Sequence, residues 1–192
     1  MDFIHIFLLS IIQGITEFLP ISSQSHLILT SYLLGLTDQG LGFDIALHFG
    51  SLIAILIYYR KEIGSLLSLS DAGLNYLRLI IIGSIPLPII GLLFIDIVSQ
   101  NMRSVFSIAL MTILFAVILY LADVKKKEVV TKLENISIYT IIFIGLMQTL
   151  AIMPGVSRSG IVITAALLAN FSREDSIKIA FLLSIPAIFM AT

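Results

Sequence analysis

Residues 13–26 read QGITEFLPISSQSH, and this stretch decides the fold because it places an acid, several hydroxyls and an imidazole in a largely apolar chain. A second stretch, residues 154–160, reads PGVSRSG and adds a guanidinium. Proline and glycine interrupt both stretches. A charged side chain at the centre of a bilayer costs at least about 2.5 kcal/mol, so ionisable groups in such surroundings predict a functional site.

The composition is that of an integral membrane protein. Of the 192 residues, 58% are hydrophobic and only 12% are charged, whereas soluble domains carry about 25% charged residues. The net charge of −1 gives no reason to expect a nucleic-acid partner. Because the chain has no cysteine, disulfides and thiolate metal sites are excluded.

Four apolar stretches are long enough, or nearly so, to cross about 30 Å of hydrocarbon as helices. They are residues 43–59, 74–95, 104–122 and 176–191. Pro86 and Pro88 predict a kink in the second stretch, which membrane helices tolerate when neighbouring groups satisfy the freed carbonyls.

Two further regions, residues 3–36 and 136–170, consist of apolar pieces that are each too short to cross alone. Each region is interrupted by one of the two polar turns, which predicts two re-entrant helix hairpins. Irregular backbone at membrane depth requires surrounding protein or a water-filled cavity. We therefore expect an all-α, polytopic membrane bundle that forms a single transmembrane domain over residues 1–192.

The basic residues favour one orientation of this bundle, with the first hairpin open to the outside and the second open to the inside. Arg103 is then the one external basic residue, and Arg158 lies in the second turn. The nine residues placed in the cytoplasm are Arg60, Lys61, Arg78, Lys125, Lys126, Lys127, Lys132, Arg173 and Lys178. This bias follows the positive-inside rule and predicts a multi-pass protein of the plasma membrane. The charge bias supports the topology of the central spans more than it supports the first hairpin. If both hairpins were instead full spans, the loops between the central spans would still alternate between the two sides.

The two turns also resemble each other. The pattern Pro20-x-x-Ser23-x-Ser25 recurs as Pro154-x-x-Ser157-x-Ser159, and each pattern follows a glutamine, Gln13 or Gln148. Interrupted segments in corresponding halves that enter from opposite faces are typical of inverted repeats meeting near the membrane midplane. Motifs this short also coincide by chance, so the repeat depends on the charge distribution for support.

The second turn has the composition of a phosphate cradle. Arg158 offers a planar fork of donors that suits phosphate oxygens, and a helix from Ile161 onward would point its first amides at the same anion. Backbone access and hydroxyl donors would come from Gly155, Gly160, Ser157 and Ser159. The alternative is that Arg158 merely neutralises Glu17 in a structural ion pair.

The first turn supplies candidate reactive groups. Ser22 and Ser23 are candidate nucleophiles, with Ser22 also able to bind phosphate, and a hydroxyl attacks well only beside a base. His26 can share a helical face with either serine and accept its proton, or can itself attack phosphorus. Glu17 is a candidate to orient the histidine, to hold a divalent cation such as Mg²⁺ or Ca²⁺, or to protonate a leaving group. Alternatively, the serines simply cap the following helix.

Two residues are candidates for supporting roles. Gln13 precedes Glu17 by four positions and so shares its helical face. His48 lies in the apolar stretch 43–59 next to Gly50 and Ser51, where a hydrogen-bonded core histidine is more typical than a catalytic one.

At these residues the chain closely resembles the undecaprenyl-diphosphate phosphatase family, which is associated with bacitracin resistance. The first family motif is an acid or glutamine, then a glutamate and a Phe-Leu-Pro-x-Ser-Ser-x-x-His run, matched by Gln13 to His26. The second, Pro-Gly-x-Ser-Arg-Ser-Gly, is residues 154–160. Residues 43–52, 172–174 and 181–187 also resemble the family, so the match runs along essentially the whole chain.

The resemblance implies hydrolysis of undecaprenyl diphosphate, or a similar polyprenyl diphosphate lipid, to its monophosphate, which regenerates a carrier for cell-wall polymers. It implies an all-helical bundle with two inverted re-entrant hairpins, often a homodimer, with a site open to the outer face. The functional residues carried over by position are Glu17, Ser23, His26, Ser157 and Arg158. The chain departs from the family at Ser25, where glycine is usual, and family members typically continue through further helices beyond Thr192.

Two other interpretations stay open at the level of sequence. Inverted re-entrant repeats are also transporter architecture, so the chain could be a transporter or flippase for an anionic lipid or solute. It could also be an inactive fragment. The acid, hydroxyl and imidazole favour chemistry, because anion transport requires the cradle but not a nucleophile and its base.

Overall fold

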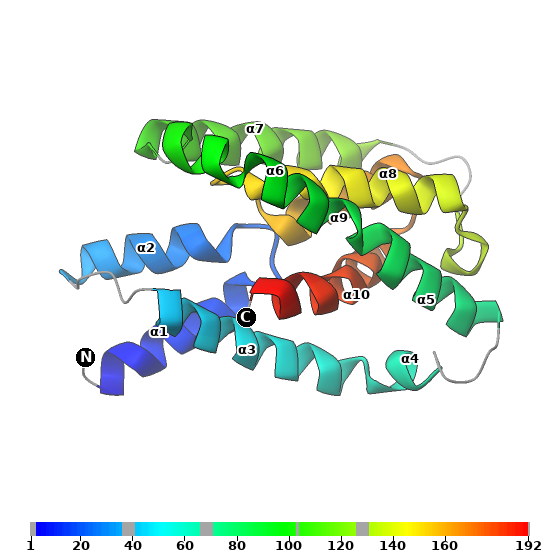
Figure 1. The fold of residues 1–192 in the computed structure, drawn as a ribbon, viewed down its shortest axis with the longest axis horizontal. Coiled ribbons are helices and arrows are strands. Elements are labelled where there is room, and N and C mark those ends of the chain that lie inside the picture. The colour runs from blue at the N-terminus through cyan, green and yellow to red at the C-terminus, as the bar shows by residue number, and fades with distance from the viewer. Residues whose placement is uncertain (1–2, 36–40, 66–70, 103, 126–130, 192) are drawn as a thin grey trace.

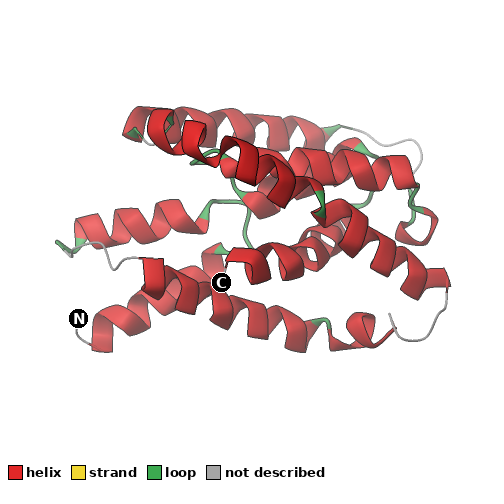
Figure 2. Cartoon of the chain, in the orientation of Figure 1, coloured by secondary structure: helices red, strands yellow, loops and turns green. Residues whose placement is uncertain are grey.

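The structure, a computed structural model, describes residues 3–35, 41–65, 71–102, 104–125 and 131–191. Within these ranges helices account for all of the regular elements, as Figure 2 shows, and the one strand-like feature is an isolated bridge between Thr131 and Phe171. The prediction of an all-α fold is therefore confirmed. Arg103, Lys126 and Lys127, which entered the charge argument, lie outside the described residues.

The first polar turn joins helix α1 (Phe3–Thr16) to helix α2 (Ser23–Leu33). The two helices pack against each other, and in Figure 1 α2 returns beside α1 toward the end from which α1 came. Pro20 lies in the turn, where its missing N–H and its restriction of the preceding residue oppose a continuous helix. Ser22 completes the reversal with a φ of 61°, a left-handed conformation that is unusual for a serine.

The second polar turn joins helix α8 (Ile138–Gln148), through the 3₁₀ turn η3 (Thr149–Ile152), to helix α9 (Arg158–Leu168). Pro154 and Gly155 interrupt the chain, and Ser157 then caps α9 by accepting the amide hydrogen of Gly160 at 3.2 Å. This cap explains why α9 begins at Arg158 rather than at the expected Ile161, and it makes Arg158 the first residue of the helix.

The remaining helices run lengthwise beside these hairpins. Their bounds are α3 (Leu41–Tyr58), α4 (Arg60–Ser65), α5 (Asp71–Ser84), α6 (Pro86–Asn101), α7 (Val105–Val124) and α10 (Arg173–Ala191). Helices α5 and α6 follow one another with a break at Ile85, directly before Pro86, where the sequence predicted a kink. In Figure 1 the hairpin of α1 and α2 opens at the left end of the molecule, and that of α8 and α9 at the right end.

Helix α9 forms the centre of the bundle. All of its residues from 159 to 167 are buried, and α7, α8 and α10 pack around it. Small residues allow close helix contacts, most clearly at Gly145 of α8, where an added Cβ would lie 2.5 Å from the carbonyl oxygen of Gly83 in α5. Polar side chains at the hairpin tips are enclosed with α9, since Glu17 is 8% and Ser159 2% exposed, whereas Leu19 in the first turn is 45% exposed.

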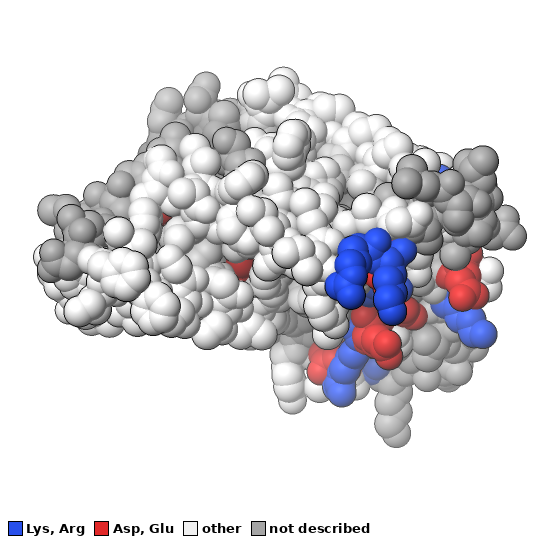
Figure 3. Space-filling model, turned by 90° about the horizontal axis from the view of Figure 1, so that it is seen from below, with Lys and Arg blue, Asp and Glu red and all other residues white. Residues whose placement is uncertain are grey.

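The outer surface is strongly apolar. Leu92 and Val105, for example, are 83% and 85% exposed, and a soluble monomer rarely exposes large contiguous apolar patches. Among the described residues, two stretches are long and apolar enough to cross a membrane, Gly73–Phe94 and Val105–Val124. Figure 3 shows that the basic side chains visible on one face gather toward one end, while most of the surface is uncharged. The number of spans and the inverted repeat stay predictions.

Candidate active site

The tips of the two hairpins meet in the middle of the molecule. The hydroxyl of Ser159 donates to the carbonyl oxygen of Leu19 at 2.9 Å. A Cβ added at Gly160 would lie 3.2 Å from the Cβ of Pro20, so glycine allows this close approach. The contact brings together the two polar stretches on which the sequence analysis was based.

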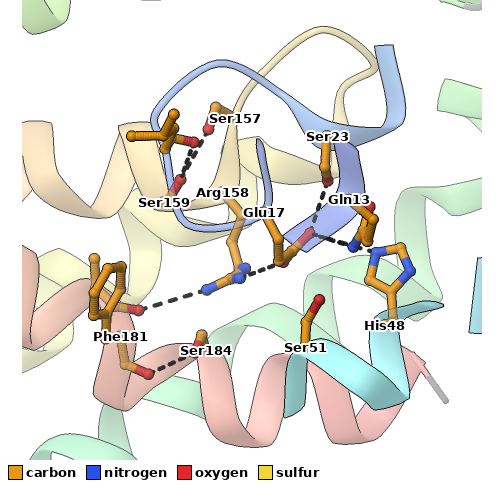
Figure 4. Close-up of polar contacts among 12 residues, drawn as sticks. Gln13, Glu17, Ser23, His48, Ser51, Ser157, Arg158, Ser159, Phe181 and Ser184 are labelled. Atoms are coloured by element: carbon orange, nitrogen blue, oxygen red, sulfur yellow. Dashed lines mark hydrogen bonds and ion pairs between the residues drawn. The ribbon is translucent and has the colours of Figure 1, made fainter. Parts of the chain in front are cut away.

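Glu17 is the centre of the polar cluster formed at this meeting point (Figure 4). Its Oε1 accepts a hydrogen bond from Nη2 of Arg158 at 2.6 Å. Its Oε2 accepts from Nε2 of Gln13 at 3.1 Å and from the hydroxyl of Ser23 at 2.7 Å. Only 8% of the Glu17 side chain is exposed, so its charge is balanced by protein groups rather than by bulk water.

Gln13 reaches Glu17 because positions four apart lie on one face of α1. Ser23 reaches the same oxygen from the first residue of α2, since the turn between the helices reverses the chain. A hydroxyl that donates to a carboxylate is arranged for loss of its proton, because the carboxylate is an acceptor only.

Arg158 is held at two points and keeps donors for a further ligand. Its Nη1 lies 3.5 Å from the carbonyl oxygen of Ala180 in α10, in addition to the bond from Nη2 to Glu17. A guanidinium has five N–H donors, and these two contacts use two of them. Because Arg158 also occupies the N-terminus of α9, the first amides of that helix favour an anion at the same place.

The two serines that flank Arg158 are engaged with the protein. Ser157 caps α9, and its hydroxyl lies 3.1 Å from that of Ser159, which is bonded to Leu19. Both serines also line the cavity beside this turn. Their hydroxyls therefore fix the shape of the turn, which presents Arg158.

A cavity of about 260 Å³ lies against this cluster. Its polar lining comes from both hairpin tips and from α3, and includes Glu17, Ser22, Ser23, His48 and Arg158. Its apolar lining comes from α6, η3 and α10, with Leu87, Ile152 and Ile188 among the residues. A site with a cationic, hydroxyl-bearing side and an apolar side suits a ligand that has an anionic head and a hydrocarbon body.

His26 lies elsewhere than the sequence spacing suggested. Its Nδ1 is 2.9 Å from the backbone oxygen of Ser22, and the hydroxyl of Ser23 donates to Glu17 instead of to His26. His26 lines a second cavity of about 270 Å³, together with Thr112, Gly155 and other residues, and Glu17 and Arg158 are not among its lining residues. The spacing of three or four residues allowed a contact between His26 and the hydroxyl of Ser22 or Ser23. In the structure the contacts of these side chains are set by the shape of the turn instead.

Gly155 also has a different role from the one its motif suggested. Its φ of +93° is in the left-handed region, and an added Cβ would lie 2.4 Å from the carbonyl oxygen of Ile108 in α7. The hydroxyl of Thr112 lies 3.0 Å from the oxygen of Gly155 and 2.9 Å from that of Ile108. Gly155 thus lets the turn pack against α7, and Thr112, which the sequence analysis did not identify, fastens it there.

Ser22 and Ser25 form a pair in the first turn. Their hydroxyl oxygens are 3.0 Å apart, and Ser22 makes no side-chain capping bond to α2. The hydroxyl of Ser25 is thus a partner of the conformationally strained Ser22. The alternative in which the Ser22 side chain caps α2 is therefore not met, although Ser22 stands at the N-cap position.

His48 faces the cluster from α3. Its Nε2 is 3.6 Å from Oε2 of Glu17, and its Nδ1 is 2.7 Å from the backbone oxygen of Asp44. One quarter of its side chain is exposed, on the wall of the first cavity. The sequence favoured a core histidine at this position, whereas the structure places it beside the central carboxylate (Figure 4).

The residues of the cluster do not fit a divalent cation held by the protein alone. Both oxygens of Glu17 already accept hydrogen bonds, from Arg158 on one side and from Gln13 and Ser23 on the other. In the part of the chain that the structure describes, no three His, Cys, Asp or Glu side chains gather as a metal site would require. Mg²⁺ and Ca²⁺ both need about six oxygen ligands, which this cluster does not provide.

The sequence is similar to a well-defined family of proteins over nearly its whole length. Residues 6–192 match the family described as bacitracin resistance protein BacA. Undecaprenyl-diphosphatase 1 of Pseudoalteromonas translucida is 45% identical over 201 residues, which cover 99% of this chain and 74% of that protein.

Two other relatives are equally close. The undecaprenyl-diphosphatase of Saccharophagus degradans is 44% identical over 199 residues, with 100% of this chain and 75% of that protein covered. That of Campylobacter curvus is 47% identical over 203 residues, with the same coverage. The chain belongs to the bacitracin resistance protein BacA family.

Proposed function

We propose that this chain hydrolyses undecaprenyl diphosphate, or a similar polyprenyl diphosphate, to the monophosphate and inorganic phosphate. The names of the relatives support this reaction, which recycles the lipid carrier for cell-wall synthesis. The observation that carries the proposal is the contact of one carboxylate, Glu17, with both the Ser23 hydroxyl and the Arg158 guanidinium on the wall of a cavity.

In this proposal Arg158 binds the terminal phosphate and stabilises the charge that develops there. Glu17 takes the proton of the Ser23 hydroxyl, and the serine oxygen forms a bond to the terminal phosphorus. The bond from that phosphorus to the bridging oxygen breaks, and the prenyl monophosphate leaves with the electron pair. The oxygen of a water molecule then bonds to the phosphorus of the phosphoserine, the bond from phosphorus to the serine oxygen breaks, and a proton from the water restores the hydroxyl as phosphate leaves. The 2.7 Å contact of Ser23 with Glu17 favours this serine over His26 as nucleophile.

The membrane arrangement is part of the proposal. We infer a multi-pass protein of the plasma membrane in which the hairpins of α1–α2 and α8–α9 form an inverted-topology repeat, with the site near the midplane and open to the outer face. In Figure 1 the hairpins open at opposite ends. The end of α3, the beginnings of α5 and α8, and the end of α7 lie together at the right end, which we assign to the cytoplasm. The basic residues on these segments support that assignment.

Two further elements are proposals of the same kind. A divalent cation, Mg²⁺ or Ca²⁺, would arrive on the oxygens of the diphosphate, since the protein groups do not form a cage for it. The family resemblance favours a homodimer, which sedimentation of the purified protein in detergent would detect.

Hydrolysis is favoured over transport by a specific contact. A transporter of anionic lipids needs the Arg158 cradle, but it has no need for a hydroxyl that donates to a buried carboxylate. The bond between Ser23 and Glu17 is therefore the feature that separates the two functions.

The test is phosphate release from undecaprenyl diphosphate or farnesyl diphosphate by the purified protein, with Mg²⁺, with Ca²⁺ and with a chelator. Wild-type protein should release phosphate, and Glu17→Gln and Arg158→Ala should abolish the release. Asp123→Asn, which breaks an ion pair with Arg173 that is remote from the cavity, should retain it. If Glu17→Gln and Arg158→Ala both keep full activity, the site is wrongly assigned. An inactive wild type that moves the lipid across vesicle membranes would favour the transporter.

A further inference from the structure

His48 meets Glu17 with one defined nitrogen. Its Nδ1 lies 2.7 Å from the backbone oxygen of Asp44, one turn earlier in α3. A carbonyl oxygen can only accept, so Nδ1 must carry the hydrogen of this bond. In a neutral imidazole the other nitrogen then has a free lone pair, and this nitrogen, Nε2, is the one that faces Oε2 of Glu17 at 3.6 Å.

With this tautomer, the interaction between Nε2 of His48 and Oε2 of Glu17 depends on whether Glu17 carries a proton. When Glu17 is ionised, Oε2 and a neutral Nε2 are both acceptors, and no hydrogen bond joins them. The separation of 3.6 Å agrees with such a pair, because it is longer than a hydrogen bond. When Glu17 gains a proton on Oε2, that hydrogen can be donated to Nε2, and its transfer gives an imidazolium beside a carboxylate.

We propose that His48 accepts the proton that Glu17 takes from Ser23. The Ser23 O–H bond breaks as the serine oxygen bonds to phosphorus, its proton moves to Oε2 of Glu17, and then to Nε2 of His48. His48 acts through Glu17 rather than on the reacting atoms, so it is a positioning residue that restores the carboxylate within one turnover. The inference rests on the proposed function.

The surroundings of His48 favour this role. On the side of α1 and α2, the group in range is Glu17, which is also contacted by Arg158 from α9. On its own helix the charged neighbour is Asp44, whose backbone oxygen fixes the ring. The ion pair of Lys178 in α10 with Glu62 in α4 lies beyond the other end of α3, whose last residue is Tyr58. Since a quarter of the His48 side chain is exposed on the cavity, the proton can leave to water.

The experiment compares the pH dependence of phosphate release in His48→Gln, His5→Gln and the wild type. Glutamine can hydrogen bond to Glu17 but cannot take up a proton near neutral pH. His48→Gln therefore distinguishes a residue that only holds Glu17 in place from one that accepts its proton. His5→Gln makes the same chemical change outside the site and should behave as wild type. Profiles of kcat and KM between about pH 5 and about pH 9 cover the range in which histidines titrate.

We expect kcat of His48→Gln to fall about tenfold or more while KM changes little, since proton transfer assists catalysis by about 10²-fold or more. Neutral His48 is the form that accepts a proton, so wild-type activity should decline as the pH falls, and this acidic limb should be lost in His48→Gln. If His48→Gln keeps the wild-type kcat, or loses activity but keeps the acidic limb, the proposal is overturned.

A second measurement does not depend on activity. In protein labelled with ¹⁵N-histidine, the His48 signals, assigned by their loss in His48→Gln, should report a hydrogen on Nδ1 and none on Nε2 at alkaline pH. The opposite tautomer would overturn the proposal even if His48→Gln were poorly folded. An inactive wild type with the expected tautomer would count against the proposed function, and with it against the proton transfer. An active wild type with an unchanged His48→Gln profile would overturn the proton transfer alone.

Discussion

Ser159 of α9 donates its hydroxyl hydrogen to the carbonyl oxygen of Leu19, 140 positions earlier in the chain, at 2.9 Å. This bond joins the two hairpin tips directly beside the ion pair of Glu17 and Arg158. Only 2% of Ser159 is exposed, so its hydroxyl has no ready access to water if the Leu19 carbonyl moves away. The bond therefore holds the tip of the first hairpin, which carries Glu17, against the tip of the second, which carries Arg158.

Ser159→Ala should lower the free energy of unfolding by about 1 kcal/mol or more, because it leaves the Leu19 carbonyl without its partner. It should also lower phosphate release, since Arg158 is adjacent to Ser159 and would lose part of its alignment with Glu17. Thermal unfolding in detergent, followed by circular dichroism, measures the first effect. Ser10→Ala is the matched control, because the Ser10 hydroxyl bonds only within its own exposed helix at Ile6. Equal losses in both variants would contradict the tip contact.

Arg158→Lys should reduce kcat/KM about 10²-fold or more although the charge is kept. A guanidinium can donate to Glu17, to the Ala180 oxygen and to a phosphate at once, whereas an ammonium is a point charge that cannot reproduce this fork. Arg173→Lys is the matched control, since Arg173 pairs with Asp123 at 2.6 Å but is 73% exposed. Exposed pairs contribute about 0–1 kcal/mol, so this variant should be almost as active and stable as wild type. A fully active Arg158→Lys would show that the fork is not needed.

Much of this site follows from local patterns in the sequence. Pro20 and Pro154 mark the turns because proline opposes a continuing helix, and Gln13 lies on the same face as Glu17 because the two are four residues apart. The similarity of the two turns predicted that they meet. The turns and the shared helical face depend on neighbours in the chain, which the sequence displays directly, whereas the meeting of the turns was predicted from their likeness alone.

The parts that could not be predicted depend on packing between distant helices. His48 reaches Glu17 only because α3 packs against α1, and no spacing between the two residues encodes that contact. Thr112 holds Gly155 for the same reason, from 43 positions away. Helical periodicity allowed His26 to contact either Ser22 or Ser23, but in the folded turn Ser23 donates to Glu17 and His26 contacts the backbone oxygen of Ser22.

Ser23→Ala and Ser22→Gly should have opposite consequences. Ser23→Ala removes the hydroxyl that contacts Glu17, so phosphate release should be lost while the fold is kept. Ser22→Gly removes the contact with Ser25 but relieves a left-handed φ of 61°, which glycine adopts without strain. Its stability should be equal to that of wild type or slightly higher, and its activity should remain. Loss of activity in Ser22→Gly together with an active Ser23→Ala would assign the nucleophile to Ser22.

Gly155→Ala should be among the most damaging small substitutions outside the polar cluster. A residue with a Cβ is strained at a φ of +93°, by about 1–2 kcal/mol. The new atom would also lie 2.4 Å from the Ile108 oxygen, which belongs to the backbone of α7 and cannot move aside easily. The turn would have to leave α7 and take Arg158 with it.

Gly14→Ala is the matched control for this substitution. Gly14 lies inside α1, where an added Cβ meets nothing within 4 Å, and alanine in a helix is favoured over glycine by about 0.5–1 kcal/mol. Thermal unfolding should therefore show Gly155→Ala clearly less stable than wild type, and Gly14→Ala equal or more stable. Phosphate release should fall only in Gly155→Ala. A stable, active Gly155→Ala would mean that the turn can pack against α7 without a left-handed residue, and the role assigned to Thr112 as its fastening would then be wrong as well.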